Sequence, residues 1–200
     1  MKSERAAMAN AFQLRYEHGR LYRQFQVSNA YASWASDVTF EAGSLVATVG
    51  WDTVGRSILR LANFGFKMRH GVFPMTSHRS ESINLDTPSQ TFREGRCLVP
   101  VDVFYEQGLG PDGDIVRSSY GSYDGSMLGL AALIRPEGAG LSVTILTIPA
   151  GVTVGSANGR MPAIVGEDDY DLWLDDTTHA KAAINLIRLP RDDLLVERPF

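Results

Sequence analysis

The sequence contains a single cysteine, Cys97, among its 200 residues. One cysteine excludes an internal disulfide, and a cysteine-based zinc site would need further cysteines at ligand spacing. The chain also lacks an apolar run of about 18 residues, the minimum for a membrane-spanning helix, and it lacks the apolar block of a secretory leader at its start. We therefore expect a soluble, cytoplasmic protein that works in a reducing compartment without contact with a membrane.

An excess of positive charge is also absent, because 19 Lys and Arg residues face 23 Asp and Glu residues, for a formal net charge of −4. This balance excludes a protein coated in phosphate-binding charge but is compatible with a local basic groove. His18, His70 and His179 show no ligand spacing with one another or with a carboxylate motif, so no metal or other cofactor is expected. His78 follows Ser77, but neighbours on a strand point to opposite faces, which argues against a serine–histidine hydrolase dyad.

Strand patterns dominate the rest of the sequence. With 44% hydrophobic and 21% charged residues, the chain has the composition of one ordinary domain, residues 1–200. Apolar and β-branched runs predict strands at residues 45–51, 58–67, 97–106, 114–118, 127–134 and 142–148. Weaker patterns predict helices at residues 15–25, 89–93, 168–174 and 178–187. Turn-rich stretches at residues 108–114 and 120–125 predict hairpin connections. We expect an α+β domain with a strongly curved, barrel-like mixed β-sheet and peripheral helices.

Three sequence blocks carry a family resemblance. Residues 77–82 read SHRSES, residues 95–106 read GRCLVPVDVFYE, and residues 158–165 read NGRMPAIV. They are similar to the NARSET, RCLVPADGFYEW and HDRMPVIL segments of the SOS-response-associated peptidase (SRAP) family of abasic-site DNA sensors. Residues 128–133 and 143–147 resemble two central strands of that family, whereas the first 60 residues match poorly. The chain thus resembles a diverged member, and because such members occur in phage genomes, the resemblance is compatible with a phage-related origin.

The resemblance implies which residues take part in the chemistry. In the family, an N-terminal cysteine condenses with the aldehyde of an abasic site and closes a thiazolidine ring. Residues 8–12, MANAF, resemble the N-terminal sequence of the family, with Ala9 in the position of that cysteine. Glu106 corresponds to the glutamate that moves protons. Ser77 stands in place of an asparagine that orients the amine, and Asn158 in place of a histidine. A carboxamide does not titrate near neutral pH, so Asn158 cannot supply a proton, and we expect efficient crosslinking to be lost.

The same resemblance implies a DNA-contacting surface. Arg79 and Arg160 correspond to family arginines that flank the abasic pocket, and Arg96 lies in the block at residues 95–106, so all three predict a local positive groove near Glu106. Without the resemblance, Arg79 and Arg160 would be expected to form ordinary ion pairs, with Glu81 as one partner, and Glu106 would be a strand-ending carboxylate paired with an arginine.

Three functions follow from these observations. The first is binding of single-stranded or abasic-site DNA in a DNA-damage response, without covalent crosslinking. The second is an inactive SRAP-like scaffold or protein-binding module, and the third is a peptidase, for which no serine, cysteine or metal constellation is assembled. Cys97 is expected to be buried and unreactive within an apolar strand, and Phe92 and Phe104 are expected to belong to the core.

Overall fold

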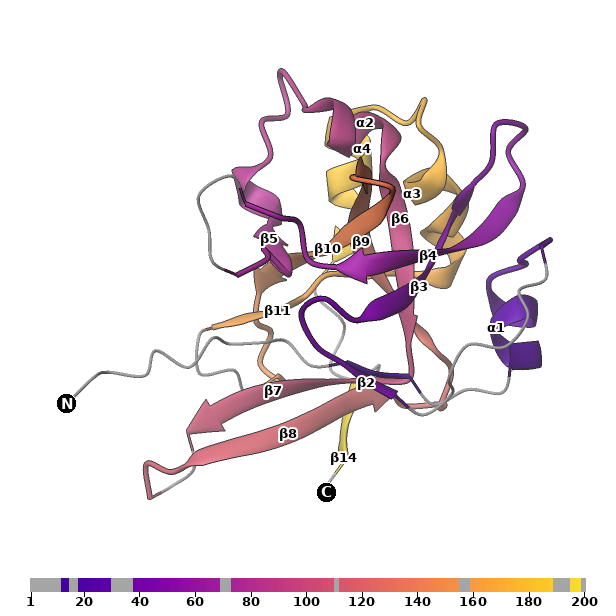
Figure 1. Ribbon diagram of the computed structural model, residues 1–200. Coiled ribbons are helices and arrows are strands. Elements are labelled where there is room, and N and C mark those ends of the chain that lie inside the picture. Colours follow the sequence, from indigo (N-terminus) through magenta and orange to yellow (C-terminus); the bar gives the residue numbers. More distant parts are fainter. Residues whose placement is uncertain are drawn as a thin grey trace.

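A computed structural model describes residues 12–14, 18–29, 38–68, 73–109, 112–154, 159–188 and 195–198. Within these residues the strands form two sheets, of five and nine strands. The smaller sheet runs along the bottom of Figure 1, below the larger one. Its strands, in spatial order, are β14 (Leu195–Arg198), β8 (Ile115–Ser122), β7 (Val103–Leu109), β1 (Phe12–Leu14) and β2 (Val38–Phe40).

The larger sheet curls round on itself. Its strands, in spatial order, are β11 (Arg160–Pro162), β10 (Gly140–Pro149), β4 (Ser57–Phe64), β3 (Leu45–Trp51), β6 (Arg96–Val101), β9 (Leu128–Glu137), β12 (Ile164–Val165) and β13 (Ile187–Arg188), with β5 (Ser77–Arg79) paired to β10. Because β10 pairs with both β9 and β4, the two sides of the sheet meet. The β10–β4 pairing is parallel and covers only Ser142↔Asn63 and Val143↔Phe64, so the sheet is strongly curled and mixed, as expected, without closing as a complete barrel.

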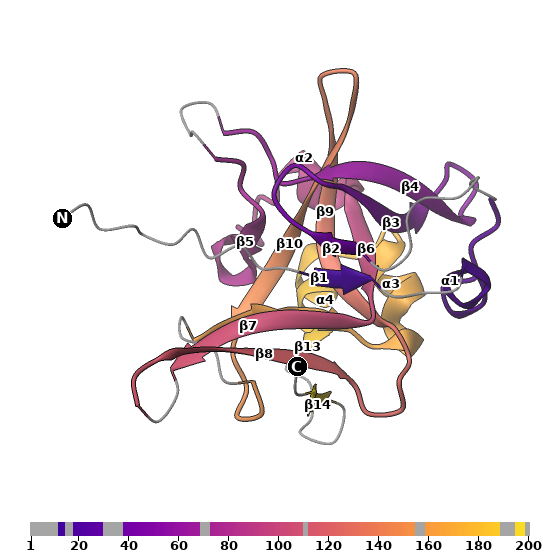
Figure 2. The same ribbon diagram turned by 60° about the horizontal axis from the view of Figure 1, so that its bottom comes forward.

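Short helices lie around the outside of the sheets (Figure 2). They are α1 (His18–Gln24), α2 (Gln90–Glu94), α3 (Tyr170–Leu174) and α4 (Ala180–Asn185), with 3-10 turns η1 (Ser80–Ser82) and η2 (Glu167–Asp169). The α2 helix begins at Ser89, whose side chain accepts a hydrogen bond from the Phe92 backbone N–H and so caps the first turn. Among the described residues, no helix is long and apolar enough to cross a membrane.

The connections between the two sheets correct two expectations. The predicted strand at residues 97–106 is broken at Asp102, where the chain bends from β6 in the larger sheet to β7 in the smaller one. Residues 108–114 do lie at a hairpin, because β7 and β8 are antiparallel neighbours. The predicted hairpin at residues 120–125 is wrong, since this stretch leads from β8 to β9 in the other sheet. A tight turn with Gly125 at φ 76° serves a change of sheet as well as a hairpin, so the local signal is the same.

The core lies between the sheets and under the helices. Phe92 and Phe104 are 1% and 0% exposed, which confirms that both belong to it. Phe92 packs edge-on against Trp173 of α3, with ring centroids 6.3 Å apart, and Phe104 stacks on Tyr120 of β8 at 5.4 Å. These aromatic contacts fix α3 against α2 and hold β7 against β8.

Candidate functional site

Two of the sequence blocks meet at the end of β10. This strand has β5 on one side and β11 on the other. Thr147 lies opposite Arg79 of β5, and Pro149 lies opposite Arg160 of β11. Residues directly opposite each other, and alternate residues along a strand, point to the same face of a sheet. The register therefore places Ser77, Arg79 and Arg160 on one face.

The members of this face differ in exposure. The side chain of Arg79 is exposed, whereas Ser77 is half-buried and the side chain of Arg160 is only 16% exposed. His78 alternates to the other face, where partial burial lowers its pKa below the ordinary value and favours the neutral ring. The hydroxyl and the imidazole of this adjacent pair thus point in opposite directions, as expected, and form no nucleophile–base pair.

Arg160 is held by a carboxylate and by its neighbouring strand. Its Nη1 donates to Glu81 Oε1 at 2.7 Å and its Nη2 donates to Glu81 Oε2 at 2.9 Å. The Nη2 also donates to the backbone oxygen of Thr147 and, at 3.1 Å, to its Oγ1. The hydrogen bonds from Arg160 hold the pKa of Glu81 at about 2, so this carboxylate is charged at neutral pH. The ion pair of Arg160 with Glu81, which the sequence analysis gave as the alternative to a contact with DNA, is present.

Glu106 lies in the smaller sheet, on β7, opposite Ser118 of β8. It is 5% exposed, which makes it the one buried acidic side chain among the described residues. The structure thus places Glu106 on a different sheet from Ser77, Arg79 and Arg160. A single cleft shared by these four residues stays a prediction.

Arg96 has a structural role in this fold in place of the expected contact with DNA. It is 5% exposed, and its guanidinium lies over the rings of Phe92 and Trp173, at 5.5 and 5.9 Å from their centroids. It donates hydrogen bonds to the backbone oxygens of Trp173 at 2.7 Å, Phe92 at 3.1 Å, Thr178 at 3.3 Å and Asp175. A guanidinium whose donors serve buried carbonyls is not available to a phosphate, so Arg96 does not belong to the positive face.

The three remaining residues singled out from the sequence are Cys97, Ala9 and Asn158. Cys97 is 1% exposed, and burial raises the pKa of its thiol, which confirms its expected place in the core. Ala9 and Asn158 lie outside the described residues. Among the residues that are described, no group of three or more His, Cys, Asp or Glu side chains is arranged to hold a metal ion.

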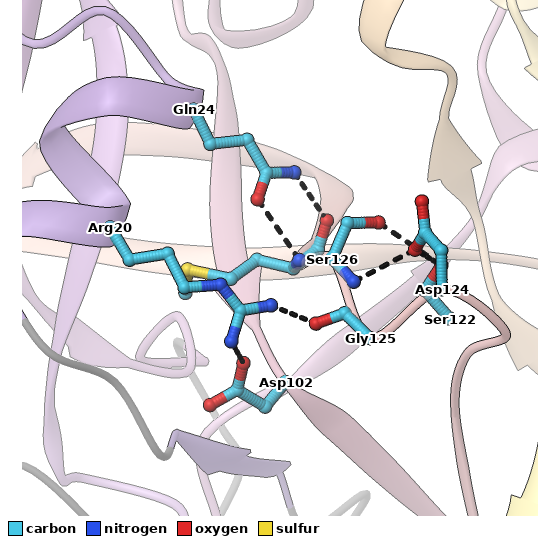
Figure 3. Close-up of polar contacts among 8 residues, drawn as sticks. Arg20, Gln24, Asp102, Ser122, Asp124, Gly125 and Ser126 are labelled. Carbon is cyan, nitrogen blue, oxygen red and sulfur yellow. Dashed lines mark hydrogen bonds and ion pairs between the residues drawn. The ribbon is translucent and has the colours of Figure 1, made fainter.

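A cluster that the sequence analysis missed fixes the start of β7. Figure 3 shows Arg20 and Gln24, one turn apart on α1, reaching the bend at Asp102 and the loop between β8 and β9. Arg20 Nη1 lies 3.6 Å from Asp102 Oδ1, and Arg20 Nη2 donates to the Gly125 oxygen. Gln24 pairs with the backbone of Met127 in both directions, at 2.7 and 3.0 Å. Asp102 directly precedes β7 and lies four residues before Glu106. By contacting the bend at Asp102, α1 helps to fix the position of the strand that contains Glu106. The only sequence signal was the i, i+4 spacing of Arg20 and Gln24 within the predicted helix at residues 15–25.

A hollow of about 770 Å³ lies elsewhere, between α1, the β3–β4 connection and α3. Its lining includes Phe25, Trp51, Glu167, Asp168 and Asp171, and it contains none of the predicted site residues. Carboxylates repel phosphates, so this hollow is a poor candidate for a nucleic-acid site.

Comparisons with known proteins agree with this fold. A phage-related protein from Bordetella bronchiseptica has a similar structure, with a TM-score of 0.77 and 18% identity over 96% of this chain and 93% of its own. A second protein from Bordetella bronchiseptica gives 0.75 and 21% over 94% of this chain and 97% of its own. A protein from Bacteroides thetaiotaomicron gives 0.66 and 15% over 80% of this chain and 75% of its own. No curated protein matches the sequence.

At such low identities the structures show a shared fold alone, and the sequence itself decides the family. It matches the profile of the family described as SOS response associated peptidase (SRAP) over residues 8–198, which includes the N-terminal residues where the sequence blocks gave little correspondence. The match covers nearly the whole chain, and the protein therefore belongs to the SRAP family.

Proposed function

We propose that this protein binds abasic or single-stranded DNA through the face that carries Ser77, Arg79 and Arg160. The observation that supports this most directly is the register at β10, which brings arginines from two separate sequence blocks onto one face. A guanidinium binds phosphate with two parallel hydrogen bonds, and the exposed Arg79 has the geometry for such a contact. Because such DNA is found with the chromosome or a phage genome, we also propose a cytoplasmic location.

We further propose that covalent crosslinking is lost. The family profile begins its match at residue 8, the first residue of the block in which Ala9 stands in the cysteine position. A thiazolidine needs an amine and a thiol on the same residue, and the chain's one thiol, Cys97, is buried on β6. Asn158 cannot donate a proton near neutral pH, and the hydroxyl of Ser77 offers one donor where an amide offers two. Proton transfer remains the proposed role of Glu106, whose burial suits a carboxylate that moves protons.

A salt titration tests the DNA-binding face. We expect the wild-type chain to bind single-stranded DNA, with or without an abasic site, and to lose affinity between about 50 and 200 mM salt, because each neutralised phosphate releases counterions. Arg79→Gln should weaken binding several-fold and reduce the slope of log affinity against log salt by about 0.7, the value for one single-strand phosphate contact.

The matched control is Arg23→Gln, an exposed arginine on α1, which lies well away from β5 in both views (Figures 1 and 2). It should leave the slope unchanged. Equal effects of the two substitutions would show that binding is unspecific, and no binding at low salt would favour an inactive SRAP-like scaffold.

A further inference from the structure

Glu81 covers the edge of Arg160 that a phosphate would use. The carboxylate takes one hydrogen bond from each terminal nitrogen of the guanidinium, at 2.7 and 2.9 Å. This is the two-point contact that a phosphate makes with arginine. The Nη2 also donates hydrogen bonds to the backbone and hydroxyl oxygens of Thr147, and these bonds hold the guanidinium against β10.

The two members of this pair are not equally accessible. The side chain of Glu81 is 50% exposed, whereas that of Arg160 is 16% exposed. A phosphate that approaches this part of the face therefore meets a carboxylate before it meets the guanidinium. The carboxylate stays charged at neutral pH, because hydrogen bonds from Arg160 keep the pKa of Glu81 at about 2.

Arg79 presents the opposite situation on the same face. It lies across β10 from Arg160, opposite Thr147, and its side chain is exposed. No ion pair to Arg79 occurs within the described part of the chain. One arginine of the face is thus open to a phosphate while the other is occupied by the chain's own carboxylate.

We propose that Glu81 gates Arg160: its carboxylate competes with DNA phosphate for the guanidinium, and DNA engages Arg160 only by displacing it. This inference rests on the proposed function. Arg79 makes the first phosphate contact, and Arg160 contributes when a second phosphate reaches the edge that Glu81 covers. The exchange is accessible because the Glu81 side chain is 50% exposed, so water hydrates its carboxylate when it leaves, and because Thr147 keeps the guanidinium in place. Displacement of Glu81 lowers the affinity of DNA that contacts Arg160, whereas DNA that reaches Arg79 alone leaves the Glu81–Arg160 pair in place.

Binding measurements on Glu81 and Arg160 variants test the gate. The probe is a fluorescent single-stranded oligonucleotide with one tetrahydrofuran abasic analogue, which cannot react covalently. Glu81→Gln should bind it about 3- to 10-fold more tightly, with a salt slope steeper by about 0.7. In an Arg160→Gln background the same change should give less than a third of that gain, because no guanidinium is left to release. Arg160→Gln alone should weaken binding less than Arg79→Gln does.

Glu81→Asp separates competition from simple repulsion. It keeps the negative charge, but the shorter side chain no longer spans both terminal nitrogens of Arg160. The gate predicts tighter binding for this variant, whereas repulsion by a fixed charge predicts no change. The melting temperature of each variant, measured alongside, identifies any loss of binding that comes from unfolding.

The outcomes are distinct. A gain from Glu81→Gln that is the same with and without Arg160, or a loss of affinity in folded Glu81→Gln and Glu81→Asp, would overturn the gate and leave the DNA-binding face intact. Failure of the wild-type chain and of every variant to bind at low salt would overturn the proposed function, and the gate with it.

Discussion

Two neighbouring residues of β6 show how far the surroundings decide a residue's role. Arg96 and Cys97 lie in the same sequence block, and an arginine or a cysteine in a DNA-binding family invites a functional reading. The fold uses Arg96 to satisfy carbonyl oxygens at the ends of α2 and α3, groups that the helices themselves leave unpaired. Cys97 is a small apolar side chain whose backbone oxygen accepts a hydrogen bond from Trp173 Nε1 at 2.9 Å. Both therefore stabilise the sheet that carries the site.

At this scale we predict that Cys97 does not react with thiol reagents in the folded protein. The thiol is 1% exposed, and burial raises its pKa far above neutrality, so the thiolate is scarce and inaccessible. Labelling should be at least about 10³-fold slower than in the unfolded chain, because it requires opening of the core. Stopped labelling followed by intact-mass measurement, with and without denaturant, gives both rates. Rapid labelling of the native chain would contradict this prediction.

Among the elements, the long strands were predictable and the short ones were not. The predicted strand at residues 45–51 coincides with β3, the predicted strand at 127–134 overlaps β9 from residue 128 on, and the predicted strand at 142–148 falls within β10. The three-residue strands β5 and β11 escaped prediction because they are too short for any periodicity to show. They form only because β10 offers them unpaired backbone groups, which is a property of the fold and not of their own sequence.

The site was predictable to a similar degree. The family blocks identified Ser77, Arg79 and Arg160, and the structure brings these three onto one face. The sequence named Glu81 only as one partner for an arginine, since no local pattern tells which carboxylate lies within reach of residue 160 when the two are 79 positions apart. The ion pair between Arg20 of α1 and Asp102 likewise joins residues that lie far apart in the sequence.

We predict that Gln24→Ala destabilises the protein by about 1 to 3 kcal/mol. The side chain of Gln24 forms hydrogen bonds with both the backbone N–H and the backbone oxygen of Met127, a residue that is 2% exposed. Alanine at position 24 would leave these two buried backbone groups without this hydrogen-bonding partner. Urea unfolding gives the free energy of unfolding for comparison with the wild type. Arg23→Ala, an exposed neighbour on the same helix, should change it by less than about 0.5 kcal/mol. Equal effects would show that helix propensity, and not the docking of α1, is responsible.

For the molecule as a whole, charge is separated by position. Acidic residues gather at η2 and α3, around the hollow next to α1, while Arg79 stands exposed at the end of β10. The net charge of −4 therefore does not describe what DNA would meet at the arginine face. Phosphate is disfavoured over the acidic side, so under the proposed function the charge pattern would favour one orientation of DNA and a strong dependence of its affinity on salt.

The last prediction concerns what covalent chemistry such a molecule retains. If the mature chain starts at Ala9, its α-amine, with an ordinary pKa of about 7.7 to 8.0, is partly neutral at pH 7.5 and can attack the aldehyde of an abasic site. The product is an imine, and without a neighbouring thiol it cannot close to a thiazolidine. We expect it to hydrolyse, with Glu106 assisting by proton transfer. The wild-type chain with a mass-verified N-terminus should thus give an adduct with abasic single-stranded DNA only when borohydride is present, and Glu106→Gln should change the rate of its formation. An adduct that survives without borohydride would contradict the proposed loss of crosslinking, whereas no adduct with borohydride would leave noncovalent binding as the proposed activity.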